Sequence, residues 1–271
     1  MREILRRLLA GELTEAEAEA ELRRVQLQEL DGQARLDIGR EDRRGLPEVV
    51  MADGKTAEAA AELVVSLARE RGQGLVSRLG ADHWATLEAR ALGVGFEVAR
   101  HRAAARVVRP GFMAPRRAGR VAILTAGTSD LDAAEEAHMM IEACGLEARV
   151  EADLGVAGLH RLLGPLAEAL AWDPDAFIVA AGMDGVLPGV VAALVDRPVI
   201  GLPVSTGYGR GGAGEAALGT MLQSCSTGLV VVNIDNGVGA GAAAVLIASR
   251  AAARAAGSPR PRPARAKPGS R

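Results

Sequence analysis

The sequence predicts an α/β protein in which a doubly wound parallel sheet, covered by helices in three layers, follows a smaller α+β domain. Two observations lead to this fold class. From residue 120 onward, short aliphatic runs alternate with helical patterns, which is typical of parallel strands joined by right-handed crossovers. The runs at 176–181 and 198–202 are also almost purely aliphatic, which indicates strands buried on both faces.

The composition agrees with this fold and argues against several functional classes. Hydrophobic residues make up 49% of the 271 residues but aromatic residues only 2%, so few side chains are available to stack nucleic-acid bases. No apolar run is long enough to cross a membrane, and the charged N-terminus does not resemble a signal peptide. The two cysteines show no metal-ligand spacing. We therefore expect a cytoplasmic protein with no membrane partner.

Residues 1–108 are predicted to form the smaller N-terminal α+β domain. Residues 2–30 suit one or two helices, with Thr14 and Glu17 spaced as a capping box. The further expected elements are a strand at 34–38, a helix at 56–71, a strand at 74–79, a helix at 82–92 and extended runs at 96–99 and 105–108.

Residues 109–119 form the predicted linker, because they hold two prolines and two glycines without an apolar period. The second domain is expected at 120–254. Its predicted strands are 120–126, 146–150, 176–181, 198–202 and 229–233, and its predicted helices are 130–144, 156–170, 186–195, 214–223 and 238–254.

Residues 255–271 are predicted to be a disordered basic tail. Residues 251–271 hold five arginines and one lysine without an acid, whereas the remainder of the chain is acidic. Because an acidic body repels nucleic-acid phosphates, we interpret the tail as a solubilising end and expect no nucleic-acid partner.

Small and polar residues follow the predicted strands, where an open α/β sheet has its ligand crevice. The first strand is followed by Gly127, Thr128, Ser129 and Asp130 directly before a helix, which is an arrangement able to bind an anion through free backbone N–H groups. Any α/β protein needs a turn here, so a purely structural turn is the alternative.

Acidic and glycine-rich turns follow the third and fourth strands of this domain. Gly182 and Met183 precede Asp184, whose carboxylate is suited to hold a hydroxyl, a magnesium ion or a proton, or else to cap the next helix. After the fourth strand, Ser205 leads into a loop with five glycines in eight residues, which also holds Tyr208, the only tyrosine. Such a loop favours closure over a ligand.

Cys225 lies just before the fifth strand of this domain, and either an inert packing role or nucleophilic catalysis suits it. Cys144 ends an ordinary helix and is interpreted as structural. Asn233, Asp235 and Asn236 follow the fifth strand as candidate binding residues. The four histidines show no zinc-binding spacing, so no zinc site is expected.

Several segments carry a resemblance to known families. G-T-S-D, A-G-M-D-G-V-L-P-G-V-V, P-V-I-G-L-P-V-S-T-G-Y-G and N-I-D-N-G resemble the PurE superfamily of aminoimidazole ribonucleotide carboxylases. S-C-S-T-G-L-V-V-V-N-I-D-N-G-V-G-A-G and D-x-x-R-x-x-R-x-G-x-P-E-V-V-x-x-x-G-K-T resemble LarB more narrowly. LarB proteins are pyridinium-3,5-biscarboxylic acid mononucleotide synthases of nickel-pincer cofactor biosynthesis.

The resemblance implies a reaction and a role for each candidate residue. The reactants are nicotinic acid adenine dinucleotide and carbon dioxide or bicarbonate, and the products are the dicarboxylated mononucleotide and AMP. Cys225 matches the position that adds covalently to the pyridinium ring, and Asp184 matches an acidic position that is often glutamate. The resemblance also implies magnesium, no organic cofactor and a homo-oligomer such as the octamer of PurE proteins.

Three basic residues of the N-terminal domain are candidates for the dinucleotide phosphates. Arg40, Arg43 and Lys55 belong to the LarB-like segment, and with the turn at 127–130 they would neutralise a pyrophosphate. Lys55 is also the only lysine outside the tail, although a chance surface lysine explains it equally well.

Two other functions remain open at this point. One is a PurE-type carboxylase or mutase that acts on aminoimidazole ribonucleotide. The other is a non-catalytic nucleotide-binding module in which Cys225 serves for packing.

Overall fold

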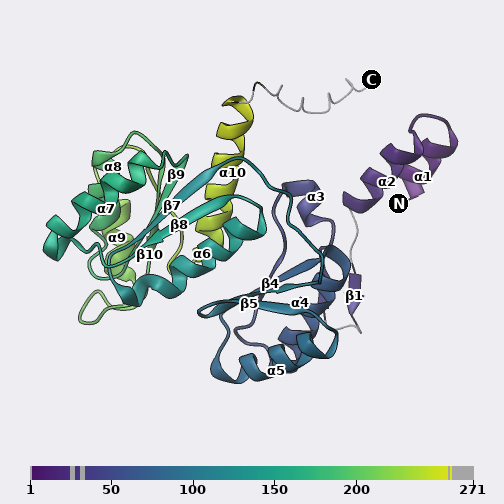
Figure 1. The fold of residues 1–271 in the computed structure, drawn as a ribbon, viewed down its shortest axis with the longest axis horizontal. Coiled ribbons are helices and arrows are strands. Elements are labelled where there is room, and N and C mark those ends of the chain that lie inside the picture. Colours follow the sequence, from purple (N-terminus) through teal and green to yellow (C-terminus); the bar gives the residue numbers. More distant parts are fainter. Residues whose placement is uncertain (1, 25–27, 31–33, 256, 258–271) are drawn as a thin grey trace, which may run out of the picture.

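The computed structural model describes residues 2–24, 28–30, 34–255 and 257, and it contains two main sheets (Figure 1). Nearly all of the predicted basic tail therefore lies outside the described residues. Within them, no helix is long and apolar enough to cross a membrane.

The C-terminal domain is built on a five-stranded parallel sheet with the order β11-β10-β9-β7-β8. Its strands are β7 (Arg120–Thr125), β8 (Glu147–Glu151), β9 (Ala176–Ala181), β10 (Val199–Pro203) and β11 (Leu229–Val231). Every neighbouring pair is parallel, and β7 lies in register with β9 from Val121↔Ala176 to Thr125↔Ala180. This is the predicted doubly wound sheet.

Helices cover both faces of this sheet, as the aliphatic strands require. They are α6 (Leu131–Ala143), α7 (His160–Ala171), α8 (Leu187–Leu194), α9 (Glu215–Leu222) and α10 (Gly237–Ala255), with short 3-10 turns η1 (Thr128–Asp130) and η2 (Val156–Gly158). One buried cluster joins α6 and α10 to the sheet, and a second cluster joins the strands to α7, α8 and α9 on the other face. Two faces with separate cores make the three-layer α/β/α fold.

The N-terminal domain has its own mixed sheet, with the order β3-β4-β6-β5. Its strands are β3 (Val49–Met51), β4 (Gln73–Ser77), β5 (Glu97–His101) and β6 (Ala104–Val108), and its helices are α3 (Arg40–Arg44), α4 (Ala57–Arg71) and α5 (Ala81–Gly93). Buried residues of α4 and α5, such as Val64 and Leu87, pack on one face of this sheet.

The first thirty residues differ from the prediction in one respect. The capping box is present, since Glu17 Oε2 accepts from Thr14 N at 2.8 Å and Thr14 Oγ1 accepts from Glu17 N at 3.3 Å. It starts α2 (Glu15–Arg24), which follows α1 (Arg2–Leu9). Residues 28–30, however, form a strand, β1 (Gln28–Leu30), that pairs antiparallel with β2 (Ala34–Leu36). The apolar pattern of so short a segment does not separate a strand from a helix end.

The two domains meet along α6, which lies between the two sheets (Figure 1). Leu75 of β4 and Ala104 at the start of β6 belong to the same buried cluster as Ala133 and Ala137 of α6. The Gln73 side chain donates from Nε2 to the Ala143 carbonyl oxygen at 2.8 Å. We call this interface the α6 seam. It gives the N-terminal domain a fixed position beside the carboxyl ends of the C-terminal strands.

Candidate functional site

A cleft of about 920 Å³ lies at the carboxyl ends of the C-terminal strands. From β7 the chain continues to β8 on one side, whereas from β9 it continues to β10 on the other, so the strand order reverses between β7 and β9. Open α/β sheets bind ligands at such a reversal. The predicted site residues that line the cleft are Gly127, Ser129, Asp130, Gly182, Met183, Asp184 and Tyr208.

Asp130 is a buried carboxylate that connects two loops of the cleft. It is only 3% exposed. Its Oδ2 accepts from Gly127 N at 2.8 Å, and its Oδ1 accepts from Thr206 Oγ1 at 2.7 Å. The loop after β9 fits closely here, since a Cβ on Gly182 would lie 2.4 Å from the Thr206 carbonyl oxygen. Asp130 therefore ties the turn after β7 to the loop after β10.

Asp184 is a carboxylate of the cleft that can contact a ligand. Its side chain is exposed, and it forms no hydrogen bond or ion pair with any residue in the described part of the chain. The turn that carries it is fixed by Gly185, whose φ of +84° favours glycine and whose Cβ, if present, would lie 2.5 Å from the Ala217 carbonyl oxygen. An unpaired carboxylate on a fixed turn is free to act on a ligand.

Aromatic and apolar surface lies at the rim of the same cleft. Tyr208 is 78% exposed and Met183 is 59% exposed, and both line the cleft. Large exposed apolar side chains at a cleft are typical of ligand sites, where they cover a planar group once it is bound. The glycine-rich loop therefore contributes to the cleft, while its closure over a ligand stays a prediction.

Arg161 is a cleft residue that the sequence reasoning did not identify. It follows β8 and η2 on α7, and it is the only basic residue among those that line the cleft in the described chain. Its Nη1 donates to both carboxylate oxygens of Asp153 at 3.0 Å. The rule that ligands bind at strand ends, applied to the strand at 147–151 as well, would have pointed to this segment.

A second pocket of about 310 Å³ adjoins the cleft and lies between the domains. It shares Ser129 and Thr206 with the cleft, and it also contains Ser205 and Asp235. The N-terminal domain contributes Arg78, which contacts the Asp235 carbonyl oxygen through Nη2 at 3.4 Å. Sequence reasoning did not single out Arg78, because its position depends on how the two domains pack.

Glu136 of α6 forms the floor of that second pocket. It is 5% exposed, its Oε1 accepts a hydrogen bond from Ser77 Oγ, and its Oε2 lies near the Val238 backbone without a hydrogen bond of good geometry. Burial raises the pKa of this carboxyl above its usual value, and the Ser77 hydrogen bond opposes that rise.

Cys225 lies in the loop between α9 and β11, outside the cleft-lining residues of the single chain. Its thiol is exposed. The loop is attached to α8 by Ser226, whose Oγ donates to the Gly189 carbonyl oxygen at 2.7 Å in the first turn of that helix. Because α8 begins three residues after Asp184, this bond links the cysteine loop to the helix that starts at the cleft.

Cys144 provides the opposite environment for a thiol. It is buried at the end of α6, and burial raises its pKa to about 12. Such a thiol stays protonated at neutral pH and is a poor nucleophile. The structure therefore gives it the packing role that was expected.

The polar residues after β11 have structural partners that the sequence did not reveal. Asn236 Oδ1 accepts from Gly239 N at 2.9 Å at the start of α10, and Asp235 Oδ1 accepts from Ser205 N at 2.8 Å. Asn233 Oδ1 accepts from the Ile234 amide at 3.0 Å. Asn233 and Asn236 thus bond within their own turn, and Asp235 joins this turn to the loop after β10; neither they nor Thr128 line the cleft, although Asp235 lines the second pocket.

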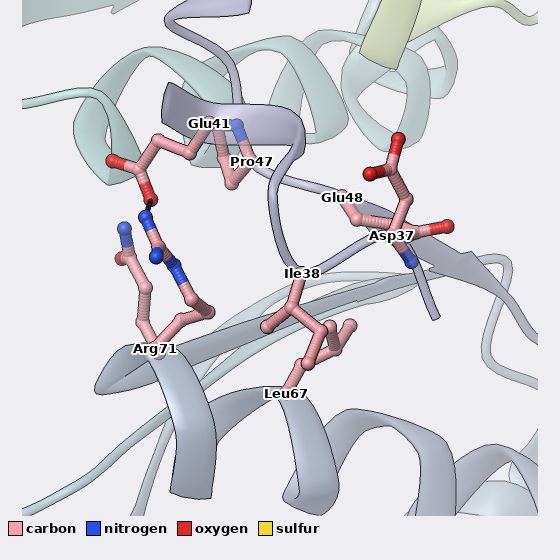
Figure 2. Close-up of a pocket in the computed structure, with 8 residues that line it drawn as sticks. Asp37, Ile38, Glu41, Pro47, Glu48, Leu67 and Arg71 are labelled. Atoms are coloured by element: carbon pink, nitrogen blue, oxygen red, sulfur yellow. Dashed lines mark hydrogen bonds and ion pairs between the residues drawn. The ribbon is translucent and has the colours of Figure 1, made fainter. Parts of the chain in front are cut away.

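Arg40, Arg43 and Lys55 are not among the residues that line the cleft or the second pocket. Arg43 pairs with Asp37, and Lys55 Nζ donates to the Met51 carbonyl oxygen at 2.8 Å. Figure 2 shows the neighbouring small pocket between α3 and α4, where Arg71 pairs with Glu41. With a volume of about 10 Å³, that pocket has room for little more than a water molecule.

Two histidines that are far apart in the sequence come together at the α6 seam. His101 ends β5, and His138 lies on α6 with Glu135 and Glu142. The two imidazole rings lie edge to face, with their centroids 5.4 Å apart. Hydrogen bonds from both histidines lower the pKa of Glu135 to about 2, and Glu135 in turn raises the pKa of His138. The spacing of the histidines in the sequence gives no sign of this pair, because the pair joins two domains.

Comparison with known families and proteins agrees with the two-domain architecture. Residues 120–258 match the AIR carboxylase family model, and residues 27–110 match the model of the LarB/PurE-like N-terminal domain. An uncharacterised protein of Methanocaldococcus jannaschii is 38% identical over 239 residues, which are 88% of this chain and 92% of that protein.

Other matches cover a smaller share of the chain. A probable N5-carboxyaminoimidazole ribonucleotide mutase of Methanothermobacter thermautotrophicus is 38% identical over 33% of this chain and 27% of its own length. A crystal structure of a PurE variant of Treponema denticola aligns at 23% identity and a TM-score of 0.38, over 51% of this chain and 92% of that one. Because an N-terminal LarB domain precedes an AIR carboxylase domain along most of its length, the chain belongs to the LarB family, with a PurE-like C-terminal domain.

Proposed function

We propose that this protein is a pyridinium-3,5-biscarboxylic acid mononucleotide synthase. It carboxylates nicotinic acid adenine dinucleotide at ring carbon 5 and hydrolyses the phosphoanhydride to release AMP. The main support is the unpaired carboxylate of Asp184 in a cleft large enough for a nucleotide, next to a helix whose first turn holds the loop of an exposed cysteine.

Cys225 supplies the nucleophile in this proposal. A pyridinium ring is too electron-poor to attack carbon dioxide, so the thiolate first forms a bond to ring carbon 4 and turns the ring into a neutral enamine. Carbon 5 then forms a bond to carbon dioxide, and its electron pair comes from the enamine. Because Cys225 is exposed, the ring can approach the sulfur without disrupting the fold.

Asp184 accepts the proton in the next step. Loss of the proton on carbon 5 returns an electron pair to the ring, the carbon–sulfur bond breaks, and the thiolate leaves as aromaticity is restored. A general base must be within hydrogen-bond reach of its proton and free of competing partners. Asp184 meets the second condition, whereas Asp130 does not, because both of its oxygens already accept hydrogen bonds.

Arg161 and the turn after β7 receive the phosphates. Arginine pairs well with phosphate oxygens, and backbone N–H groups at the start of a helix favour an anion. Water attacks one phosphorus atom of the phosphoanhydride, and AMP leaves. No organic cofactor takes part in these steps.

The described lining fits a magnesium ion held mainly by substrate. Magnesium takes oxygen ligands and usually keeps one or two protein carboxylates together with phosphates and water. With Asp184 kept for the ring proton, the cleft offers the Ser129 hydroxyl beside the phosphate and water oxygens, and no cluster of three acidic, histidine or cysteine ligands lies there among the described residues. Once bound, magnesium would neutralise the pyrophosphate charge.

The proposal includes a homo-oligomer, of which the octamer of PurE proteins is the expected form. Static light scattering of the purified protein tests it. A monomer at micromolar concentration would contradict this part of the proposal and leave the reaction itself to be tested separately.

A second candidate function is that of an N5-carboxyaminoimidazole ribonucleotide mutase, because curated relatives of the C-terminal domain carry that name. That chemistry gives no role to an exposed cysteine or to an additional N-terminal domain. Parallel assays distinguish the two candidate activities. One assay supplies aminoimidazole ribonucleotide with bicarbonate, and the other supplies its carboxylated form alone.

The deciding experiment incubates the protein with nicotinic acid adenine dinucleotide, bicarbonate and magnesium, with products identified by mass spectrometry. We expect the dicarboxylated mononucleotide and AMP from the wild type and from Cys144→Ala, but no carboxylated product from Cys225→Ala. The Cys144→Ala variant is the matched control, since its thiol is buried. Absence of carboxylated product from a folded wild type that still binds the dinucleotide would refute the reaction.

Thiol alkylation tests whether the protein is instead a non-catalytic binding module. With a pKa of about 12, Cys144 has a thiolate fraction on the order of 10⁻⁴ at pH 8, so alkylation at neutral pH should be confined to Cys225. We expect the dinucleotide to protect Cys225. Unchanged alkylation at saturating dinucleotide would favour the binding module.

A further inference from the structure

The α6 seam contains a group of metal-ligating side chains that the proposed reaction does not use. His101 comes from β5 of the N-terminal domain, while Glu135, His138 and Glu142 come from α6 of the C-terminal domain. Along α6 these three residues are spaced by three, four and seven positions, so they share one face of the helix. His101, Glu135 and His138 each place a ligand atom within 4.8 Å of the others.

The distances within this group are those expected between ligands of one ion. Glu135 Oε2 lies 3.2 Å from His101 Nδ1 and 3.3 Å from His138 Nδ1. Around a tetrahedral zinc ion, bond lengths of about 2.0–2.1 Å place neighbouring ligand atoms roughly 3.3–3.4 Å apart. The same two contacts are also hydrogen bonds in this structure, although hydrogen bonds between an imidazolium and a carboxylate are usually shorter, at about 2.7–2.9 Å.

Glu142 occupies the position of an outer partner. Its carboxylate oxygens lie 3.4 Å from His101 Nε2 and 3.5 Å from His138 Nε2, which are the ring nitrogens that face away from Glu135. Metal-ligating histidines nearly always direct their second nitrogen to a carboxylate or carbonyl, which orients the ring and makes it a better ligand. Here one carboxylate serves both rings.

The two carboxylates of the group would also balance the charge of a bound cation. Two carboxylates lie beside two imidazoles, and in the described part of the chain only these histidines pair with Glu135 and Glu142. His101 is only 7% exposed, whereas the Glu142 carboxylate on the outer side of the group is 42% exposed.

We propose that His101 Nδ1, His138 Nδ1 and Glu135 bind one divalent transition-metal ion of the zinc class, with Glu142 as the positioning residue and water as a fourth ligand. Imidazole nitrogen favours zinc, copper, nickel or iron over magnesium, which takes oxygen ligands. The ion joins β5 to α6 and so fastens the N-terminal domain to the C-terminal domain. It lies outside the cleft-lining residues and serves a structural purpose.

The test measures zinc binding to protein that has been treated with a chelator and desalted, by competition with a chromogenic indicator. We expect one zinc ion per wild-type chain and a rise in melting temperature of roughly 5–10 °C at zinc a hundredfold above Kd. His138→Ala and His101→Ala should lose the stoichiometric ion and most of that rise. Glu142→Gln should bind zinc about 10–100-fold more weakly.

Two matched variants control for other ligands. His160→Ala removes an exposed histidine of α7, and Cys225→Ala removes the exposed thiol, so both should keep the ion. Millimolar magnesium should not displace it. The proposal fails if the wild type binds no stoichiometric zinc, if both seam histidine variants bind as the wild type does, or if Cys225→Ala is the variant that loses the ion. Melting curves recorded without metal verify that each variant is folded.

Discussion

Carboxylates at the cleft and carboxylates at the α6 seam differ in what surrounds them. In the cleft, Asp184 is exposed and unpaired among the described residues. At the seam, Glu135 lies between two histidines and Glu136 accepts a hydrogen bond from Ser77 of the other domain. A ligand can use the first kind of group without cost to the fold, whereas the second kind already contributes to holding the domains together.

This difference separates two kinds of mutational effect. Removing an unpaired cleft group should change kinetics and leave the melting temperature in place. Removing one member of a buried pair leaves its partner unsatisfied, which typically costs about 1–3 kcal/mol. Asp130 lines the cleft, but it is buried and both of its oxygens accept hydrogen bonds. Its removal should therefore affect mainly stability.

Asp184→Asn should have the largest effect. The amide keeps the shape but cannot accept the ring proton, so we expect kcat to fall about 10²–10⁴-fold. The melting temperature should shift by less than the equivalent of about 0.5 kcal/mol, because the carboxylate has no partner to lose in the described structure. Product formation under single-turnover conditions and a thermal melt measure the two. Asp196→Asn, on the exposed surface, is the control, and a normal rate in Asp184→Asn would remove it from the chemistry.

Asp130→Asn should act mainly on stability. An amide offers one acceptor and one donor, whereas the Gly127 N–H and the Thr206 hydroxyl both donate to this side chain. We expect a loss of about 2 kcal/mol, or roughly 4–8 °C in melting temperature. Differential scanning calorimetry measures it. If kcat fell while the melting temperature held, Asp130 would have to take part in the reaction directly.

The C-terminal fold was predictable because each local pattern agrees with the sheet. Aliphatic strands such as 176–181 and the helices between them follow directly from the period of the sequence, and the strand-end rule placed Gly127, Gly182 and Asp184 at one cleft. The sequence contexts of the two cysteines also predicted different roles, and the structure shows Cys144 buried and Cys225 exposed.

Contacts between domains were not predictable, because they depend on packing rather than on local pattern. The histidine pair joins residues 101 and 138, and Arg78 reaches Asp235 across the seam. No spacing rule connects positions in two separate domains. Asn236 was predicted as a binding residue, and the sequence did not reveal its hydrogen bond to Gly239 N at the start of α10.

Arg161→Gln should weaken dinucleotide binding without affecting the bond-making steps. We expect KM to rise about 5–10-fold with kcat nearly unchanged, since a charged hydrogen bond to phosphate is lost at an exposed position. Arg197→Gln is the matched control, because Arg197 likewise pairs with an exposed aspartate but lies outside the cleft. Steady-state kinetics decide, and equal KM values for the two variants would show that Arg161 does not meet the phosphates.

Ser77→Ala should have the smallest effect, and it should change the stability of the protein rather than its turnover. Without the hydroxyl, Glu136 loses its only side-chain donor while its other oxygen already lacks a hydrogen bond of good geometry, so a loss of about 1 kcal/mol, or roughly 2–4 °C, is expected. Ser66→Ala is the control, because Ser66 is equally buried but meets Glu62 only at 3.4 Å on its own helix, and it should melt within about 1 °C of the wild type. Turnover by Ser77→Ala should match the wild type at temperatures well below its melting point. A fall in kcat with an unchanged melting temperature would instead mean that the position of α6 at the seam affects the cleft. Such coupling is physically possible because α6 begins directly after Asp130, which bonds two loops of the cleft.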